Sequence, residues 1–137
     1  MIRSVNVANL WLNVYKNNPT EGGTDGVLVS ENGEMTSPVD VTLNAAQNES
    51  KTTKLALRCR DGYKTDGVAT IQDDGDSNDR WKFSTSQDGV FSDVITIAND
   101  ITTVNTVFWA RIDSDSSENP SISTNVKIKA TAPILPV

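Results

Sequence analysis

The chain has 137 residues, of which 36% are hydrophobic, and its net charge is −6. This length suits one domain with one hydrophobic core, and the hydrophobic fraction lies above that of disordered chains. The acidic balance argues against nucleic acid and anionic membrane as partners, because both would repel the protein. No run of 18 apolar residues is present to span a bilayer, and the first residues do not resemble a secretory signal.

Turn residues divide the chain into short segments. Six of the eight glycines directly follow Asp or Asn. Asp-Gly and Asn-Gly pairs supply the positive φ angles that tight hairpin turns require. A spacing of about ten residues between turn signals is typical of a β-sandwich or barrel. The six glycines are Gly26, Gly33, Gly62, Gly67, Gly75 and Gly89.

Apolar and polar residues alternate between these turns. The alternation is clearest in residues 39–45, 54–60 and 126–131. A period of two is typical of a strand with one face in the core and the other in water. We therefore predict one all-β domain over residues 1–137, an antiparallel β-sandwich of eight or nine strands with an N-terminal segment 1–9 and an apolar tail 131–137. The further strands are expected at residues 10–15, 27–31, 68–71, 80–84, 94–98 and 106–112.

The residues of the commonest catalytic sites are missing. A carboxylate pair could still hydrolyse glycosides, but among 18 acidic residues two fall within catalytic distance by chance. The chain has no histidine, and its one cysteine, Cys59, lies in an alternating apolar segment. This removes His-based triads, Cys-His pairs, most zinc sites and the commonest general base. The glycine spacing fits neither a P-loop nor a dinucleotide-binding turn. We predict a non-enzymatic protein with no catalytic residue and no cofactor, in which Cys59 is a small buried hydrophobe.

Two acidic segments offer oxygen ligands for calcium. The first fails as an EF-hand loop, because Asp79 stands where the turn glycine belongs and Thr85 where the bidentate glutamate belongs. Asp and Asn in turns commonly bond their own backbone, so we predict solvated turns without metal and keep calcium as an alternative. The candidate ligands are Asp74, Asp76 and Asn78 in one segment and Asp113, Asp115 and Glu118 in the other.

Three tryptophans, Trp11, Trp81 and Trp109, each lie in an expected strand. Sugar sites stack pyranose rings on exposed aromatic faces, which keeps a carbohydrate-binding module open as an alternative. Trp81 shares a face with Phe83 at a period of two and is expected to point inward. Trp109 follows Phe108, so one of these two points outward unless both faces are covered. Core packing is the preferred interpretation for each tryptophan.

Basic residues follow one face of the segment 54–60, namely Lys54, Arg58 and Arg60, with Lys51 and Lys64 just beyond its ends. A solvated outer face is the usual reason for such a stripe. In an acidic protein, it also suits docking against an acidic neighbour or a second copy.

The order of the C-terminal half resembles the last hairpin of immunoglobulin-like β-sandwich modules. Residues 108–112 (FWARI) lead into a polar stretch, and residues 125–130 (NVKIKA) close the domain. With residues 54–64 (KLALRCRDGYK), this layout is similar to small Ig-like proteins from tailed-bacteriophage structural gene clusters. The likeness covers about residues 25–131, and the paired cysteines of antibody domains are absent.

The resemblance implies an Ig-like virion structural protein that decorates a capsid or builds a tail and is assembled in the host cytoplasm. Its partners would be capsid or tail proteins and possibly a second copy. The alternatives are a carbohydrate-binding module and a surface adhesin domain with turn-bound calcium. The residues that we predict to contact the partner lie near the two ends and on the basic stripe: Ile2, Val5, Val7, Ile134, Leu135, Val137, Arg58 and Arg60.

Overall fold

The computed structural model describes residues 2–6, 12–29, 50–74, 81–113 and 127–137. All regular structure in these ranges is β, and ten strands form two antiparallel sheets of five strands each. The prediction of an all-β sandwich is therefore confirmed. The described residues contain more strands than the eight or nine expected.

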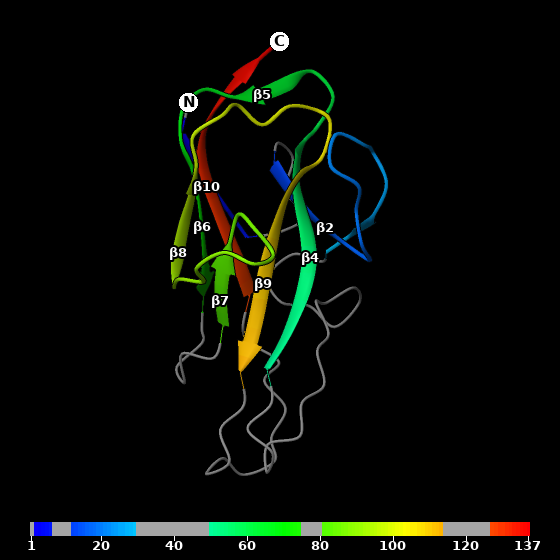
Figure 1. Cartoon of the computed structure of the whole chain (residues 1–137). Coiled ribbons are helices and arrows are strands. Elements are labelled where there is room, and N and C mark those ends of the chain that lie inside the picture. The colour runs from blue at the N-terminus through cyan, green and yellow to red at the C-terminus, as the bar shows by residue number, and fades with distance from the viewer. Residues whose placement is uncertain (1, 7–11, 30–49, 75–80, 114–126) are drawn as a thin grey trace.

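The two sheets lie face to face, with β10, β6 and β8 on one side of the molecule and β2, β4 and β9 on the other (Figure 1). The first sheet contains, in spatial order, β1 (Ile2–Asn6), β10 (Lys127–Pro136), β6 (Ala69–Asp74) and β8 (Val94–Ile97), and β5 (Tyr63–Thr65) pairs with the far end of β10. The second sheet contains, in spatial order, β3 (Val27–Leu28), β2 (Leu12–Lys16), β4 (Ser50–Cys59), β9 (Thr106–Asp113) and β7 (Trp81–Ser84).

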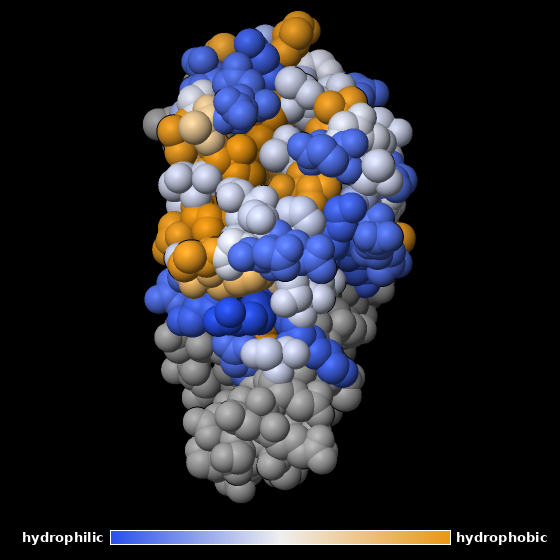
Figure 2. Space-filling view, viewed as in Figure 1, coloured by the Kyte–Doolittle hydropathy of each residue, from blue (hydrophilic) through white to orange (hydrophobic). Residues whose placement is uncertain are grey.

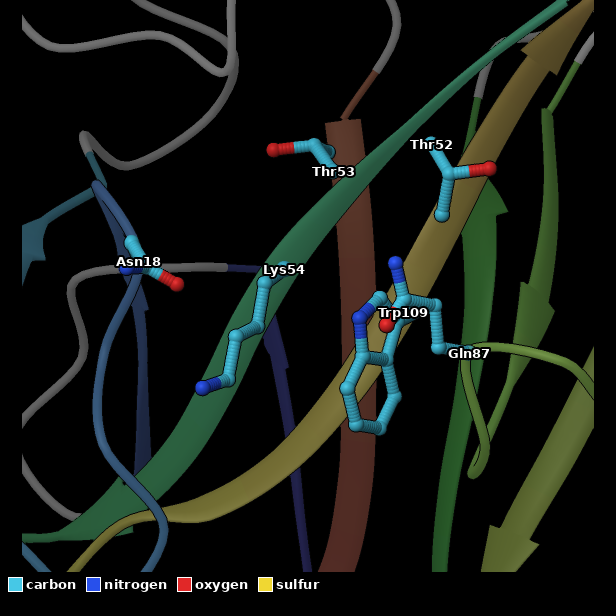
Figure 3. Close-up of a pocket in the computed structure, with 6 residues that line it drawn as sticks. All are labelled: Asn18, Thr52, Thr53, Lys54, Gln87 and Trp109. Carbon is cyan, nitrogen blue, oxygen red and sulfur yellow. The ribbon is translucent and has the colours of Figure 1, made fainter.

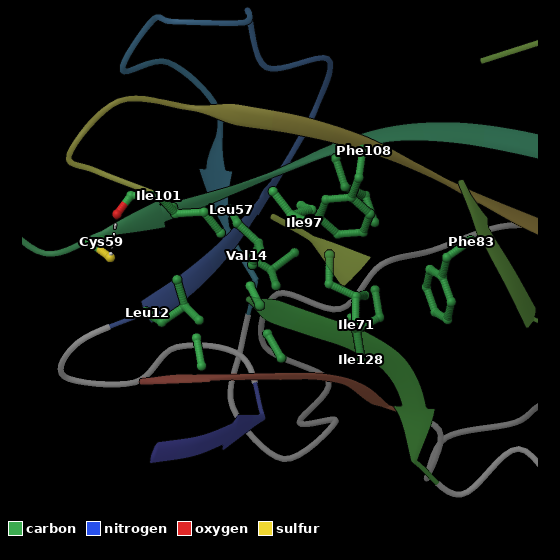
Figure 4. Packing of buried hydrophobic residues seen from close by; sticks show 14 of the residues in the cluster. Leu12, Val14, Leu57, Cys59, Ile71, Phe83, Ile97, Ile101, Phe108 and Ile128 are labelled. Carbon is green, nitrogen blue, oxygen red and sulfur yellow. Dashed lines mark hydrogen bonds between the residues drawn. The ribbon is translucent and has the colours of Figure 1, made fainter. Parts of the chain in front are cut away.

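The core fills the space between the sheets, because the strand period of two turns every second side chain inward. On β4, Leu55 and Leu57 are completely buried. The rings of Phe83 on β7 and Phe108 on β9 pack in a tilted arrangement with their centroids 6.4 Å apart (Figure 4). Full burial of one such side chain contributes about 1.5–3 kcal/mol. The cluster also includes Leu12, Val14, Val29, Cys59, Ile71, Ile97, Ile101, Ile128, Ile134 and four alanines, Ala69, Ala110, Ala130 and Ala132.

Eight of the nine predicted strands overlap strands of the structure, which are β2, β3, β4, β6, β7, β8, β9 and β10. The ninth, residues 39–45, lies outside the described residues. Strands β1 and β5 were not predicted. The predicted apolar tail is not separate from the last strand, because β10 continues through residue 136.

The predicted turn glycines are partly confirmed. Positive φ angles occur at Gly26 (113°), Gly62 (90°) and Gly67 (126°). Gly62 lies in the tight connection between β4 and β5, where the N–H of Tyr63 donates to the carbonyl of Arg60 (3.1 Å). Gly89 does not adopt a positive φ. Gly33 and Gly75 lie outside the described residues.

Candidate functional site

The sequence left open which residue of the Phe108–Trp109 pair faces outward. Phe108 is completely buried between the sheets, and its neighbour Trp109 is half-buried on the outer face of β9. The register places Trp109 opposite Lys54 on β4 and opposite Ser84 on β7. The prediction of core packing is therefore wrong for Trp109, because strand alternation gives the inward position to Phe108.

The other two tryptophans have different outcomes. Trp81 is partly buried and packs against the core from β7, two residues before the buried Phe83, so its predicted inward orientation is confirmed. Trp11 lies outside the described residues. Among the described tryptophans, only Trp109 lies on an outer face of the sandwich.

A hollow of about 390 Å³ opens beside Trp109 on this outer face. Figure 3 shows Trp109 on β9, Lys54 on the neighbouring strand β4, Asn18 in the loop after β2, and Gln87 in the loop after β7. Thr52 and Thr53 of β4 complete the lining. The hollow thus combines one large aromatic ring with amide, hydroxyl and ammonium groups.

The two loops at the hollow are held by hydrogen bonds to the sheets. Asn105, which is 2% exposed, donates from its side-chain amide to the carbonyl of Thr20 (3.0 Å) and to the carbonyl of Asp25 (3.1 Å). These bonds fix the loop that carries Asn18, whose φ of 59° lies in the left-handed region. The loop that carries Gln87 is closed by two backbone bonds between Phe83 and Ser92, each 2.8 Å long.

The predicted basic stripe is divided by the structure. The Arg58 guanidinium lies over the ring of Tyr15 at 3.6 Å from the centroid, and it donates to the carbonyl of Thr24. Arg58 is therefore occupied by contacts with β2 and with the loop that follows it. Arg60 lies beyond the end of β4, exposed in the turn before β5. Lys54 makes a different contact from either arginine, because it lies opposite Trp109 in the pairing of β4 with β9.

Ile134 corrects our prediction for the C-terminal tail. Its side chain is 1% exposed and belongs to the hydrophobic core, so it is not available to a partner. The reason is the strand period, which turns Ala132 and Ile134 inward while Leu135 remains 36% exposed. Val137 is 82% exposed.

The two chain ends meet along β10. Backbone pairing of β1 with β10 places Ile2 opposite Pro133 and Val5 opposite Ala130. Val7 lies outside the described residues. At the far end of β10, the N–H of Val137 donates to the carbonyl of Gly62 (2.7 Å), in the turn that follows Arg60. Leu135, Val137 and Arg60, predicted separately as contact residues, therefore share one end of the sandwich.

The candidate calcium ligands are only partly described. Asp74 is the last residue of β6, and Asp113, the last residue of β9, accepts a hydrogen bond from Ser50 and lies 3.2 Å from Nε of Arg111. Within the described ranges, no group of three or more His, Cys, Asp and Glu side chains is arranged to hold a metal ion. The remaining candidate ligands, Asp76, Asn78, Asp115 and Glu118, lie outside those ranges.

Cys59 is buried as predicted, with 4% of its surface exposed. Burial raises the pKa of its thiol to about 11, because the thiolate would lose its hydration. The Sγ atom donates to the carbonyl of Ile101 (3.4 Å), a bond drawn in Figure 4. A neutral, enclosed thiol of this kind is a poor nucleophile.

No known protein family, curated protein or solved structure matches the chain. The described residues include no helix long and apolar enough to cross a membrane.

Proposed function

We propose that the chain is a non-enzymatic structural protein of a bacteriophage virion, which attaches to a capsid or tail surface through one end of its β-sandwich. We call the attachment surface the terminal patch and define it as Arg60, Val68, Leu135 and Val137. The observation that carries the proposal is the convergence of three separate chain segments on this patch. Figure 2 shows hydrophobic surface at the C-terminal end of β10, where the patch begins.

The backbone holds the terminal patch in place. The N–H of Asp66 donates to the carbonyl of Pro133 (2.8 Å), and the bond from Val137 to Gly62 ties the last residue to the β4–β5 turn. Val68, which is 50% exposed, follows shortly after Asp66 and precedes β6. A partner therefore meets a backbone that is already ordered, which lowers the entropic cost of binding.

The composition of the patch suits a protein partner. Three of its four members are aliphatic and the fourth is Arg60, and the ion pair of Lys64 with Asp100 (3.7 Å) lies beside it, because Lys64 is paired with Leu135. Apolar centres with polar rims are typical of specific protein interfaces. Burying one aliphatic side chain completely contributes about 1.5–3 kcal/mol, and repeated copies on a particle would multiply the effect.

The test replaces the exposed aliphatics of the patch and leaves the core intact. The double variant Leu135→Ser, Val137→Ser is compared with Val90→Ser, Val94→Ser as a matched control. In the first pair, the exposed fraction is 36% for Leu135 and 82% for Val137. In the control pair, it is 45% for Val94 and 85% for Val90. Both pairs are therefore expected to fold, which a thermal melt verifies.

The measurement is co-sedimentation with particles of a phage that encodes the chain, purified after deletion of its gene. We expect the Leu135→Ser, Val137→Ser variant to bind the particles at least about tenfold more weakly than wild type, since about 1.4 kcal/mol corresponds to a factor of ten. The control variant is expected to bind normally. Equal binding of both variants would contradict the terminal patch, and no binding of the wild type would contradict the virion function.

A further inference from the structure

We propose that the hollow beside Trp109 is a carbohydrate site that binds one pyranose ring of an oligosaccharide. The hollow lies on the outer face of the β4–β9 sheet and shares no residue with the terminal patch. The proposal is independent of the virion function and stands on three properties of the hollow: the groups that line it, the way they are held, and the lack of other partners for three of them.

The lining groups match the two kinds of surface that a pyranose presents. One face of the sugar ring carries C–H groups, which pack on the π face of an indole such as that of Trp109. The ring edge carries hydroxyls, which both donate and accept hydrogen bonds. The amides of Asn18 and Gln87 offer donors and acceptors, Thr52 a hydroxyl, and Lys54 three further donors. The volume of about 390 Å³ is within the range of small-molecule sites.

The lining groups come from elements with fixed positions. Trp109 and Lys54 face one another in the register of β9 and β4, the longest strand pair of the second sheet. The loop of Gln87 contains an additional bond from the N–H of Gly89 to the carbonyl of Ser86 (3.2 Å). In Figure 3 the Gln87 amide lies beside the indole of Trp109. Such preorganisation reduces the ordering cost that limits weak sugar binding.

Three of the polar side chains that line the hollow are not used by the fold. Within the described part of the chain, the indole N–H of Trp109 and the side-chain amides of Asn18 and Gln87 have no hydrogen-bond partner. The side-chain amide of Asn105, in contrast, donates hydrogen bonds to Thr20 and Asp25 in the loop after β2. Trp109, Asn18 and Gln87 are therefore open to contact by a ligand.

The chemistry of the hollow favours sugar over other ligands that stack on an indole. A nucleic acid strand would meet a protein with a net charge of −6, which repels its phosphates. A proline-rich peptide would require a groove with several aromatic or aliphatic walls. Apart from Trp109, every side chain that lines the hollow is polar or charged.

The test titrates the full ¹⁵N-labelled chain with three tetrasaccharides: cellotetraose, chitotetraose and tetragalacturonate. They represent neutral, N-acetylated and acidic pyranoses. The readout is the indole N–H resonance of Trp109, assigned by its disappearance in Trp109→Phe. We expect at least one probe to shift this resonance with a dissociation constant on the order of 1 mM or tighter. The resonance of Trp81, on the inner face, is expected to stay in place.

Two variants separate sugar binding from folding. Gln87→Ala removes one amide from an exposed loop, and Asn18→Gly removes the other while it keeps the left-handed backbone at φ 59°. Each is expected to weaken binding at least about tenfold without lowering the melting temperature. Asn99→Gly, an exposed amide in the loop after β8, is the matched control and is expected to bind as wild type does. Absence of a Trp109 shift with all three probes, or unchanged affinity in both variants, would overturn the proposal.

Discussion

The side-chain amide of Asn105 bonds Asp25 at two points, the backbone carbonyl (3.1 Å) and Oδ1 of the carboxylate (3.0 Å). The two residues are 80 positions apart in the chain. The backbone continues the connection, since the N–H of Asn105 donates to the carbonyl of Gly23 (2.8 Å) and its own carbonyl accepts from Gly22 (3.0 Å). One buried residue, directly before β9, thereby fixes the loop that follows β2.

The first prediction concerns this connection. We expect Asn105→Ala to lower the free energy of unfolding by about 1–3 kcal/mol, because the carbonyls of Thr20 and Asp25 lose their donor in a part-buried place. Urea denaturation measures the loss. The control is Asn99→Ala at an exposed position, where a change within about 0.5 kcal/mol is expected. Equal losses for the two variants would show that the amide of Asn105 is not a structural connection.

The second prediction concerns pH. Hydrogen bonds from the backbone N–H and the hydroxyl of Thr20, both 2.8 Å, hold the pKa of the Asp25 carboxyl below its ordinary value of 3.8. The unfolded chain therefore binds the proton at a higher pH than the folded chain does. The stability that the carboxylate contributes is fully present above the unfolded value and is lost as the pH falls through the lower, folded value.

Asp25→Asn removes this titration. We expect the difference in unfolding free energy between wild type and Asp25→Asn to be constant well above pH 3.8 and to shrink as the pH falls below it. Chemical denaturation over a series of pH values measures the difference. Asp88→Asn, which replaces an exposed carboxylate in the loop after β7, corrects for the change in net charge. A difference for Asp25→Asn that is independent of pH would contradict the role of Thr20.

The strands that the sequence predicted are those with a long alternating pattern between turn residues. β9 shows this well, because buried positions alternate over most of its length. In β4 the pattern is confined to its second half, where Leu55, Leu57 and Cys59 are buried. β5 has only three residues, too few for a period of two to be recognised. The five residues of β1, Ile2–Asn6, do not alternate between apolar and polar side chains. They form a strand because they pair with β10, and this long-range contact cannot be recognised in the local sequence.

The end of β10 was mistaken for a tail because it contains Pro133 and Pro136, which donate no backbone hydrogen bond. In the structure, Pro133 lies at the point where β10 changes from one neighbouring strand to another. β10 pairs with β6 as far as Thr131 and with β5 from Ile134 onward, so no N–H is needed from residue 133 in either ladder. The carbonyl of Pro133 still accepts a bond from Asp66. Pro133 therefore does not end the strand, and the reason is the arrangement of the neighbouring strands and not the local sequence.

The candidate sites were predictable to different degrees. The sequence established that Trp109 and Phe108 face opposite ways, yet it gave no preference between them. Gln87 and Asn18 carried no signal, because both lie in polar loops of ordinary composition. Their proximity to Trp109 results from the order of the strands in the second sheet, which brings the loops after β2 and β7 to the same face.

The third prediction compares two neighbours on β10. Ile134→Ala is expected to lower the free energy of unfolding by about 2–5 kcal/mol, because Ile134 is 1% exposed in the core. Leu135→Ala is expected to cost less than about 1 kcal/mol, since its side chain is on the outer face and 36% exposed. Thermal or urea denaturation distinguishes the two. Similar losses would mean that the inward and outward positions of β10 are assigned wrongly.

The last prediction concerns the reactivity of Cys59. Its pKa rises from 9.0 to about 11 because burial disfavours the thiolate, so at pH 8 the thiolate population falls by about 100-fold. Enclosure between the sheets slows access further. We expect a small aromatic disulfide reagent to label the native protein at least about 100-fold more slowly than the urea-unfolded protein at that pH. Cys59→Ser measures the background. Because labelling of a buried thiol requires opening of the structure, a destabilising change such as Ile134→Ala should accelerate it, by about tenfold for each 1.4 kcal/mol of stability lost where the opening exposes both residues. Rapid labelling of the native wild type would show that Cys59 is accessible and that the end of the core beside Ile101 opens readily.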